Sequence, residues 1–194
     1  MDDSLLIRKF CSDGDGDAAV ELLGKYQRAL YQFIWQMLHH SQDCEDAMQE
    51  TFSKALLALP RYREENHFKS WLFRIGRNEA IEIIRRRRRT VVAEAPEECL
   101  GTDPLLDLQP AAREVMEQKE RLQSLDKAIA QLPDAEREVL ALRLQGDLPF
   151  KEIAQVIDVP LGTVLARMHR AKKRVKSLLE SESNESNDGH KDRK

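Results

Sequence analysis

Residues 148–175 read LPFKEIAQVIDVPLGTVLARMHRAKKRV, and this stretch decides the fold of the C-terminal half of the chain. Apolar residues recur at helical spacing on both sides of a turn at residues 159–162. The residues predicted to share the two buried faces are Ile153, Ala154 and Ile157 before the turn and Val164, Met168, Ala171 and Val175 after it. Two short helices joined by such a turn are typical of a helix-turn-helix, whose second helix enters the major groove of duplex DNA.

The outer face of the second predicted helix, residues 163–176, is rich in cations. Arg167 and Arg170 lie near its start, where a guanidinium group can pair bidentately with guanine. We expect Thr163 to cap the helix and to contact a phosphate. The other residues expected at the DNA are His169 and the phosphate-neutralising Lys172, Lys173 and Lys176. A solvated basic helix in an ordinary bundle is the alternative, but the turn, the apolar stripe and the cationic face coincide, which favours DNA binding.

A second basic segment, residues 68–89, reads FKSWLFRIGRNEAIEIIRRRRR. Arg74, Asn78 and Arg85 share one face of the predicted helix, and Arg77 lies beside them. Amide and guanidinium groups on one face suit the recognition of exposed bases and backbone. The arginine run at 85–89 alone would indicate only a solvated charge run or phosphate contacts.

Aromatic residues at Tyr62, Phe68 and Trp71 accompany this basic face and can stack on unpaired bases. Phe68 and Trp71 also stand at helical spacing, which fits a role in the core. Tyr62 lies in a predicted loop and is therefore the freer candidate. Together the two basic segments predict a protein that holds duplex DNA and opened DNA at once.

The composition indicates compact helical domains without covalent or metal chemistry. The chain has 194 residues, 41% of them hydrophobic, and lacks the long apolar run of a membrane span or a secretory signal, so we expect it to be cytoplasmic. Three scattered cysteines support neither a disulfide framework nor a zinc site. His39, His40 and Cys44 are close in sequence but lack a fourth metal ligand at a familiar spacing, so we expect no metal site. The net charge of −3 conceals two basic segments within acidic surroundings. The acidic segments can bind a basic partner surface.

The fold class predicted from these patterns is all-α, with two small helical domains joined by a flexible linker. We place the first domain at residues 1–92, the linker at 93–112, the second domain at 113–180 and a disordered polar tail at 181–194. Polar residues at 12–17 are expected to cap one helix, and Ser41 or Asp43 the next. Asp134 is expected to cap a helix over 137–145, with Gly146 as its stop.

The chain resembles the group 4, or extracytoplasmic-function (ECF), sigma factors of bacterial RNA polymerase. The resemblance rests on DCEDAMQETFSKAL at 43–56, FKSWLFRIGRN at 68–78 and the stretch 132–175, and it runs from about residue 5 to 179. It implies a region 2 and a region 4, joined by the linker. Leu165 and Ala166 depart from the family, where many members carry a cation and a serine, so readout of DNA shape is an open alternative there.

The resemblance also implies partners and residue roles. Core RNA polymerase, promoter DNA and, for many members, an anti-sigma factor are the expected partners, and neither a cofactor nor a small-molecule substrate is expected. The residues implied for polymerase docking are Asp46, Gln49 and Glu50. Those implied for the −10 element are Tyr62, Trp71, Arg74, Arg77, Asn78 and Arg85, with Tyr62, Arg74 and Asn78 at the flipped base. Those implied for the −35 element are Thr163, Arg167, His169, Arg170 and Lys173.

Two other classes of function were weighed against this one. An autonomous helix-turn-helix repressor or activator, with residues 1–110 as a sensor or dimerisation domain, explains the C-terminal module but gives the basic face of 68–89 no role. An enzyme is disfavoured because no glycine-rich phosphate loop, nucleophile–base set or metal-ligand cluster stands in the sequence.

Overall fold

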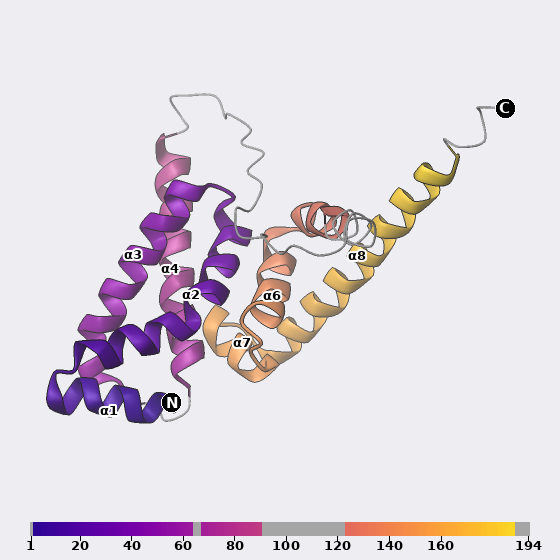
Figure 1. Cartoon of the computed structure of the whole chain (residues 1–194). Helices are drawn as coiled ribbons and strands as arrows, with labels where there is room; N and C mark the ends of the chain where they lie inside the picture. The colour runs from indigo at the N-terminus through magenta and orange to yellow at the C-terminus, as the bar shows by residue number, and fades with distance from the viewer. Residues whose placement is uncertain (1, 64–66, 91–122, 189–194) are drawn as a thin grey trace, which may run out of the picture.

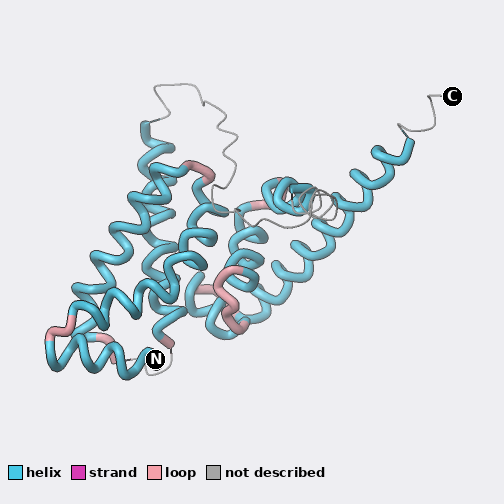
Figure 2. The backbone as a smooth tube through the Cα atoms, in the orientation of Figure 1, coloured by secondary structure: helices cyan, strands magenta, loops and turns pink. Residues whose placement is uncertain are grey.

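The computed structural model describes residues 2–63, 67–90 and 123–188, and the elements in these ranges are helices (Figures 1 and 2). The N-terminal part holds α1 (Asp3–Asp13), α2 (Gly16–Leu38), α3 (Ser41–Ala58), the short 3-10 helix η1 (Leu59–Arg61) and α4 (Phe68–Thr90). The C-terminal part holds a helix at 123–130, then α6 (Asp134–Leu144), α7 (Phe150–Ile157) and α8 (Leu161–Asp188). The predicted all-α class is confirmed. The predicted linker at 93–112 lies outside the described residues.

Helices α2, α3 and α4 form the core of the N-terminal bundle. Gly76 lets α4 approach its neighbours closely, because a Cβ there would lie 2.8 Å from a methyl group of Leu30 on α2. On α3, the buried Thr51 donates its hydroxyl proton to the carbonyl of Ala47, at 2.6 Å, and so satisfies a hydroxyl group that lies 3.6 Å from where this Cβ would stand. Phe33 and Phe73 meet across the bundle with ring centroids 5.5 Å apart.

The helix starts follow the sequence prediction at α2 and depart from it at α3, α6 and α8. Asp15 caps α2, as expected for the polar turn, and accepts hydrogen bonds from the amides of Asp17 and Ala18. The cap of α3 is His40, not Ser41 or Asp43: its imidazole accepts from the Asp43 amide. The prediction missed it because the chain leaves α2 through a left-handed residue, which sets His40 in the extended cap conformation.

Asp134 and Gly146 are also placed differently from the expectation. Helix α6 begins at Asp134 itself, which pairs with Arg137 in the first turn and is not its cap. After α6 the left-handed position is taken by Asp147, at φ 43°, and not by Gly146. Gly146 is needed for a different reason: a Cβ there would lie 2.5 Å from the Leu142 carbonyl oxygen and 3.2 Å from the ring of Phe73. The turn therefore packs backbone against a side chain of α4.

The helix-turn-helix is present as α7 and α8. Asp158 ends α7 in the left-handed conformation, at φ 54°, and the Val159 amide donates to the Ala154 carbonyl. Helix α8 begins at Leu161, so Thr163 lies inside its first turn. The prediction that Thr163 caps this helix is therefore wrong. The helix continues to Asp188, into the segment predicted to be a disordered tail. The upstream turns of this helix are already packed, so its extension needs no new nucleation. The composition of the tail alone does not reveal this.

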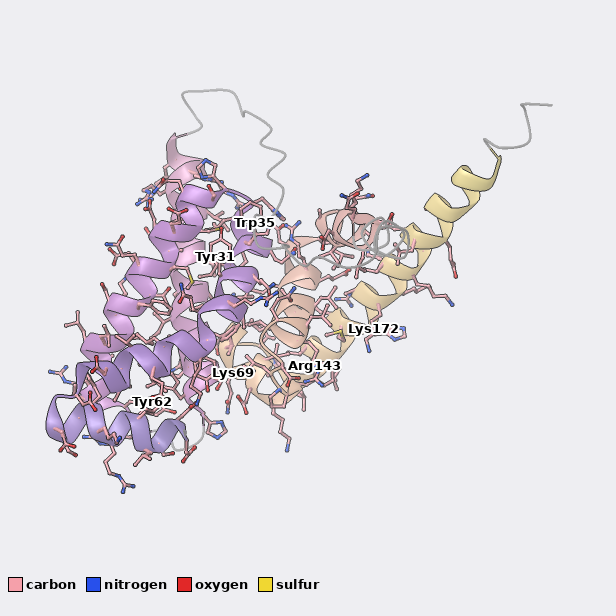
Figure 3. All side chains as sticks on the ribbon, viewed as in Figure 1. Tyr31, Trp35, Tyr62, Lys69, Arg143 and Lys172 are labelled. Carbon is pink, nitrogen blue, oxygen red and sulfur yellow. The ribbon has the colours of Figure 1, made fainter. Side chains whose placement is uncertain are left out.

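The two helical parts pack against each other, with α6 beside α2 and α7 beside α4. On α2 a stripe of rings runs toward this contact: Tyr31 stacks near Trp35, and Trp35 meets His39 edge-on (Figure 3). Burial lowers the pKa of His39, and the nearby Arg137 guanidinium on α6 lowers it further against the opposing effect of Asp134. The imidazole is therefore held neutral where the two parts meet.

Gly146→Ala tests the close approach of the turn to α4. The added methyl group meets backbone and ring atoms, so we expect a loss of about 1–3 kcal/mol in the free energy of unfolding, measured by urea titration. Gly24→Ala is the matched control, because it adds the same methyl group in mid-helix with nothing within 4 Å and should stabilise by up to about 1 kcal/mol. Equal effects of the two substitutions would contradict the packing described.

His39 predicts a pH dependence of stability with a defined sign. The unfolded chain titrates near the ordinary pKa of 6.5, and the folded chain titrates below it. The contribution of neutral His39 to the free energy of unfolding is therefore fully present above pH 6.5. It is lost as the pH falls toward the folded pKa, because in this range only the unfolded state takes up the proton. Denaturant titrations from pH 8 to pH 5 should show this loss in the wild type and a smaller loss in His39→Asn, which keeps a left-handed turn. His169→Asn, exposed on α8, should leave the wild-type profile unchanged.

Candidate nucleic-acid interface

The outer face of α4 presents Arg74, Asn78 and Arg85 to solvent, as the helical spacing predicted. A shallow cavity of about 320 Å³ lies on this face. Its lining residues are Lys54, Arg77, Asn78, Glu79, Ile81, Glu82 and Arg85. Glu79 holds the Lys54 ammonium at 2.6 Å, so the cavity combines an amide with paired and exposed charges. It thus gathers three of the residues predicted to contact the −10 element, while Arg74, Tyr62 and Trp71 lie outside its lining.

Tyr62, Phe68 and Trp71 form one aromatic cluster where the chain enters α4. The Tyr62 and Trp71 ring centroids are 5.0 Å apart, and Phe68 lies 5.8 Å from Tyr62 and 5.4 Å from Trp71. Phe68 is buried, whereas Tyr62 and Trp71 are half-buried. The core role weighed for Phe68 is therefore the one that the structure shows, and the two remaining rings keep surface on which a base can stack.

Arg77 is directed toward the C-terminal helices rather than toward open solvent. Its Nε donates to Glu138 Oε1 of α6 at 2.6 Å, and the two side chains are only 20% and 12% exposed. A second pair, His67 Nδ1 with Glu152 Oε1 of α7, stands 3.5 Å apart near the start of α4. A predicted −10 contact is thus engaged within the chain. Sequence reasoning missed Glu138, because the pair joins residues 61 positions apart.

On α8, Lys172 points away from the N-terminal bundle (Figure 3). His169, Arg170 and Lys173 are exposed there, while Arg167 and Thr163 are half-buried. Of the predicted buried stripe, Val164, Met168 and Ala171 are buried, and Val175 is half-buried. The structure therefore brings the five predicted −35 residues onto one helix with its apolar side covered.

Glu136 of α6 is a feature of this face that the sequence analysis did not single out. Its carboxylate is buried and lies 3.0 Å from Nε of both Arg170 and Arg174. Its position could have indicated this burial, because Glu136 lies three residues before Val139 and therefore on the same face of the helix. This helix packs against α8. A carboxylate at such a position needs a cation beside it.

Helix α3 carries the residues predicted to bind polymerase, on the edge of the bundle away from α6 and α8 (Figure 1). Gln49 and Glu50 are exposed, and Asp46 is half-buried. Gln42 donates to the Asp46 carboxylate at 3.3 Å, which fixes that side chain within the helix surface. The predicted docking face is thus open while Arg77 is engaged.

Residues that had been weighed as metal ligands have structural roles. His39 packs between α2 and α6, His40 caps α3, and the Cys44 thiol is buried, which raises its pKa to about 11. Within residues 2–63, 67–90 and 123–188, no cluster of His, Cys, Asp or Glu is suited to hold a metal ion, and no helix is long and apolar enough to cross a membrane.

Comparisons with known proteins agree with this geometry. Residues 22–90 match the family model for sigma-70 region 2, and residues 122–175 match that for sigma-70 region 4. The RNA polymerase sigma-H factor of Pseudomonas aeruginosa (strain PAO1) is 34% identical over 86% of this chain and 89% of its own length. The ECF RNA polymerase sigma factor SigW of Bacillus subtilis (strain 168) is 28% identical over 86% and 91%.

A solved structure supports the same assignment. The sigma factor RpoE of Bartonella quintana, crystallised with the anti-sigma factor NepR, superposes with a TM-score of 0.69 at 25% identity, over 82% of this chain and 95% of that one. CnrH, solved with the cytosolic domain of CnrY, shares the fold with a TM-score of 0.65. The two matched regions include the two surfaces predicted to contact DNA, on α4 and on α8. The chain belongs to the sigma-70 family of RNA polymerase sigma factors, in its extracytoplasmic-function group.

Proposed function

We propose that this chain starts transcription by joining core RNA polymerase and gripping two promoter elements in different states. The α6–α8 part holds the −35 element as duplex, and the α2–α4 part holds the −10 element once it opens. The observation that carries this proposal is the presence of two surfaces of different chemistry on one chain: a cationic helix-turn-helix and a face of amide, guanidinium and aromatic groups.

The −35 contacts are assigned to the outer face of α8. Arg167, His169 and Arg170 face the base edges, and Thr163 and Lys173 contact the backbone. The exposed Leu165 adds apolar surface at the start of the helix, 46% of it accessible. Such a side chain fits a thymine methyl group, and this is how sequence preference arises where other members of the family have a cation.

The −10 contacts are assigned to the outer face of α4. Asn78 reads the edge of an unstacked base, and Arg74 and Arg85 hold the strand backbone. Tyr62 and Trp71 supply the ring surface against which that base stacks, worth about 1–3 kcal/mol per base. This gain offsets the few kcal/mol that unstacking costs, so the opened strand is stabilised without any covalent chemistry by this chain.

The remaining parts of the proposal concern partners. Asp46, Gln49 and Glu50 on the open face of α3 dock on core polymerase, which supplies catalysis, so the chain is not itself an enzyme and acts in the cytoplasm. An anti-sigma factor is a further partner, by analogy with the Bartonella complex. Simultaneous grip on two separated elements requires α6 and α7 to leave α2 and α4, after which the linker keeps both parts at a high effective concentration.

Run-off transcription with purified core polymerase and a genomic fragment library tests the function as a whole. We expect discrete transcripts that appear only when this chain is added. An autonomous repressor or activator would instead bind a palindromic duplex tightly without polymerase and yield no new transcript, and that result would contradict the proposal.

Asn78→Ala tests the base-capture role. We expect promoter opening, measured with permanganate on unpaired thymines, to fall at least about fivefold, because an edge contact to a base is worth about 1–3 kcal/mol. Binding to core polymerase should not change. Gln27→Ala, an exposed amide on α2, is the control and should behave as wild type. Tyr62→Ala is a less direct test, because its ring packs on Trp71 and Phe68. Equal losses of opening and polymerase binding in Asn78→Ala would exclude base capture by this residue.

A further inference from the structure

Two arginines on the outer face of α8 share one buried carboxylate. The Nε of Arg170 donates to Oε1 of Glu136 at 3.0 Å, and the Nε of Arg174 lies 3.0 Å from Oε2. The Glu136 side chain is 7% exposed, while the two arginine side chains are 52% and 56% exposed. The carboxylate thus lies beneath the surface, and the arginines reach over it toward solvent.

This arrangement fixes how the Arg170 guanidinium is presented, because a hydrogen bond holds it, whereas Arg174 is held beside it by an ion pair alone. The contact uses Nε, so the terminal NH₂ groups keep donors for a further acceptor. An arginine side chain free in solvent has considerable rotamer entropy to lose on binding. A guanidinium already held by a buried acid loses less, which favours affinity for the acceptor that matches its fixed direction.

The two arginines stand at different depths along the recognition helix. Arg170 is one turn nearer the helix start, where side chains reach base edges, and Arg174 is one turn further on, where they reach phosphates. The carboxylate balances one of the two positive charges, so the pair presents a net charge of +1 rather than +2. This lowers attraction to any phosphate backbone and leaves relatively more of the affinity to the base contact.

We propose that Glu136 is a positioning residue for readout of the −35 element: it holds the Arg170 guanidinium in the direction that reads one base pair and sets Arg174 beside it on the backbone. The inference rests on the proposed function, because it takes α8 to be the reading helix. It adds to that function a determinant of specificity that lies on α6 and does not touch DNA.

A purely structural role for Glu136 predicts a different effect of its substitution on DNA binding. If the carboxylate only fastens α6 to α8, its loss lowers stability and weakens binding to all DNA sequences together. If it positions Arg170, its replacement by glutamine frees the guanidinium and unmasks one positive charge. Binding to unrelated sequence is then kept or strengthened, and only discrimination is lost.

The experiment uses holoenzyme reconstituted from core polymerase and the full chain. It selects from a duplex library that is randomised across the upstream element, and the selected pool is sequenced. We expect Arg170→Ala to flatten the preference at one base pair, and Glu136→Gln to flatten the same base pair by about tenfold and no other. Binding to a duplex of scrambled sequence, measured across salt concentrations, should be unchanged or tighter for Glu136→Gln, with a slope steeper by about one.

Glu180→Gln is the matched control. It makes the same change of charge on α8, but its carboxylate contacts Lys176 and not an arginine of the pair, so the base preferences should equal those of wild type. Preferences at the Arg170 position that survive in Glu136→Gln, or a parallel loss of specific and scrambled binding, would overturn the inference.

Arg174→Gln keeps the inference testable if Glu136→Gln fails to fold. It leaves the Glu136–Arg170 contact in place, so the base preferences should persist while affinity falls on every sequence and the salt slope decreases by about one. A changed preference in this variant contradicts the assignment. If wild-type holoenzyme selects sequences but Arg170→Ala selects the same ones, the positioning role is wrong, whereas a wild-type holoenzyme that selects nothing overturns the proposed function itself.

Discussion

The contact of Phe73 with the turn at Gly146 is the constraint on which the arrangement of the two regions depends. The ring is fully buried and contacts both the N-terminal core, through Phe33, and the backbone of the turn between α6 and α7. A Cβ atom at residue 146 would lie 3.2 Å from this ring and 2.5 Å from the Leu142 carbonyl oxygen, so there is no room for an added carbon atom. Around it, Arg77 pairs with Glu138 and His67 with Glu152, so apolar and charged contacts converge on one side of α4.

The packing of the two helical parts leaves some of the predicted binding surfaces accessible and covers others. The docking face of α3 and the cationic face of α8 are accessible, whereas Arg77 of the −10 set is engaged by region 4. Under the proposed function, a chain in this state can meet polymerase but presents its two proposed DNA surfaces at one fixed separation. The proposal therefore couples formation of an initiation complex to release of α6 and α7, so that any interaction that favours the packed state lowers the apparent affinity for promoters.

Sequence reasoning found the features that are local in the chain. The helical stripes, the α7–α8 motif, the Asp15 cap and the shared face of Arg74 and Asn78 all follow from spacing and turn chemistry. It could not find what depends on contacts distant in sequence: the pairing of Arg77 with Glu138, or the burial of Glu136 under Arg170. The close fit at Gly146 was missed for the same reason, because a ring of α4 decides it. The cap at His40 was missed because it depends on the left-handed conformation of the residue directly before it.

We infer that the packed arrangement is that of the free chain and gives way in the initiation complex. Fluorescence energy transfer between dyes on Val20→Cys of α2 and Ser177→Cys of α8, both exposed positions, measures it directly in a chain whose Cys11 and Cys99 are serine. The account predicts one population of high transfer for the free chain and a population of lower transfer once core polymerase and promoter DNA are bound. Low transfer in the free chain, or transfer that does not change on binding, would contradict it.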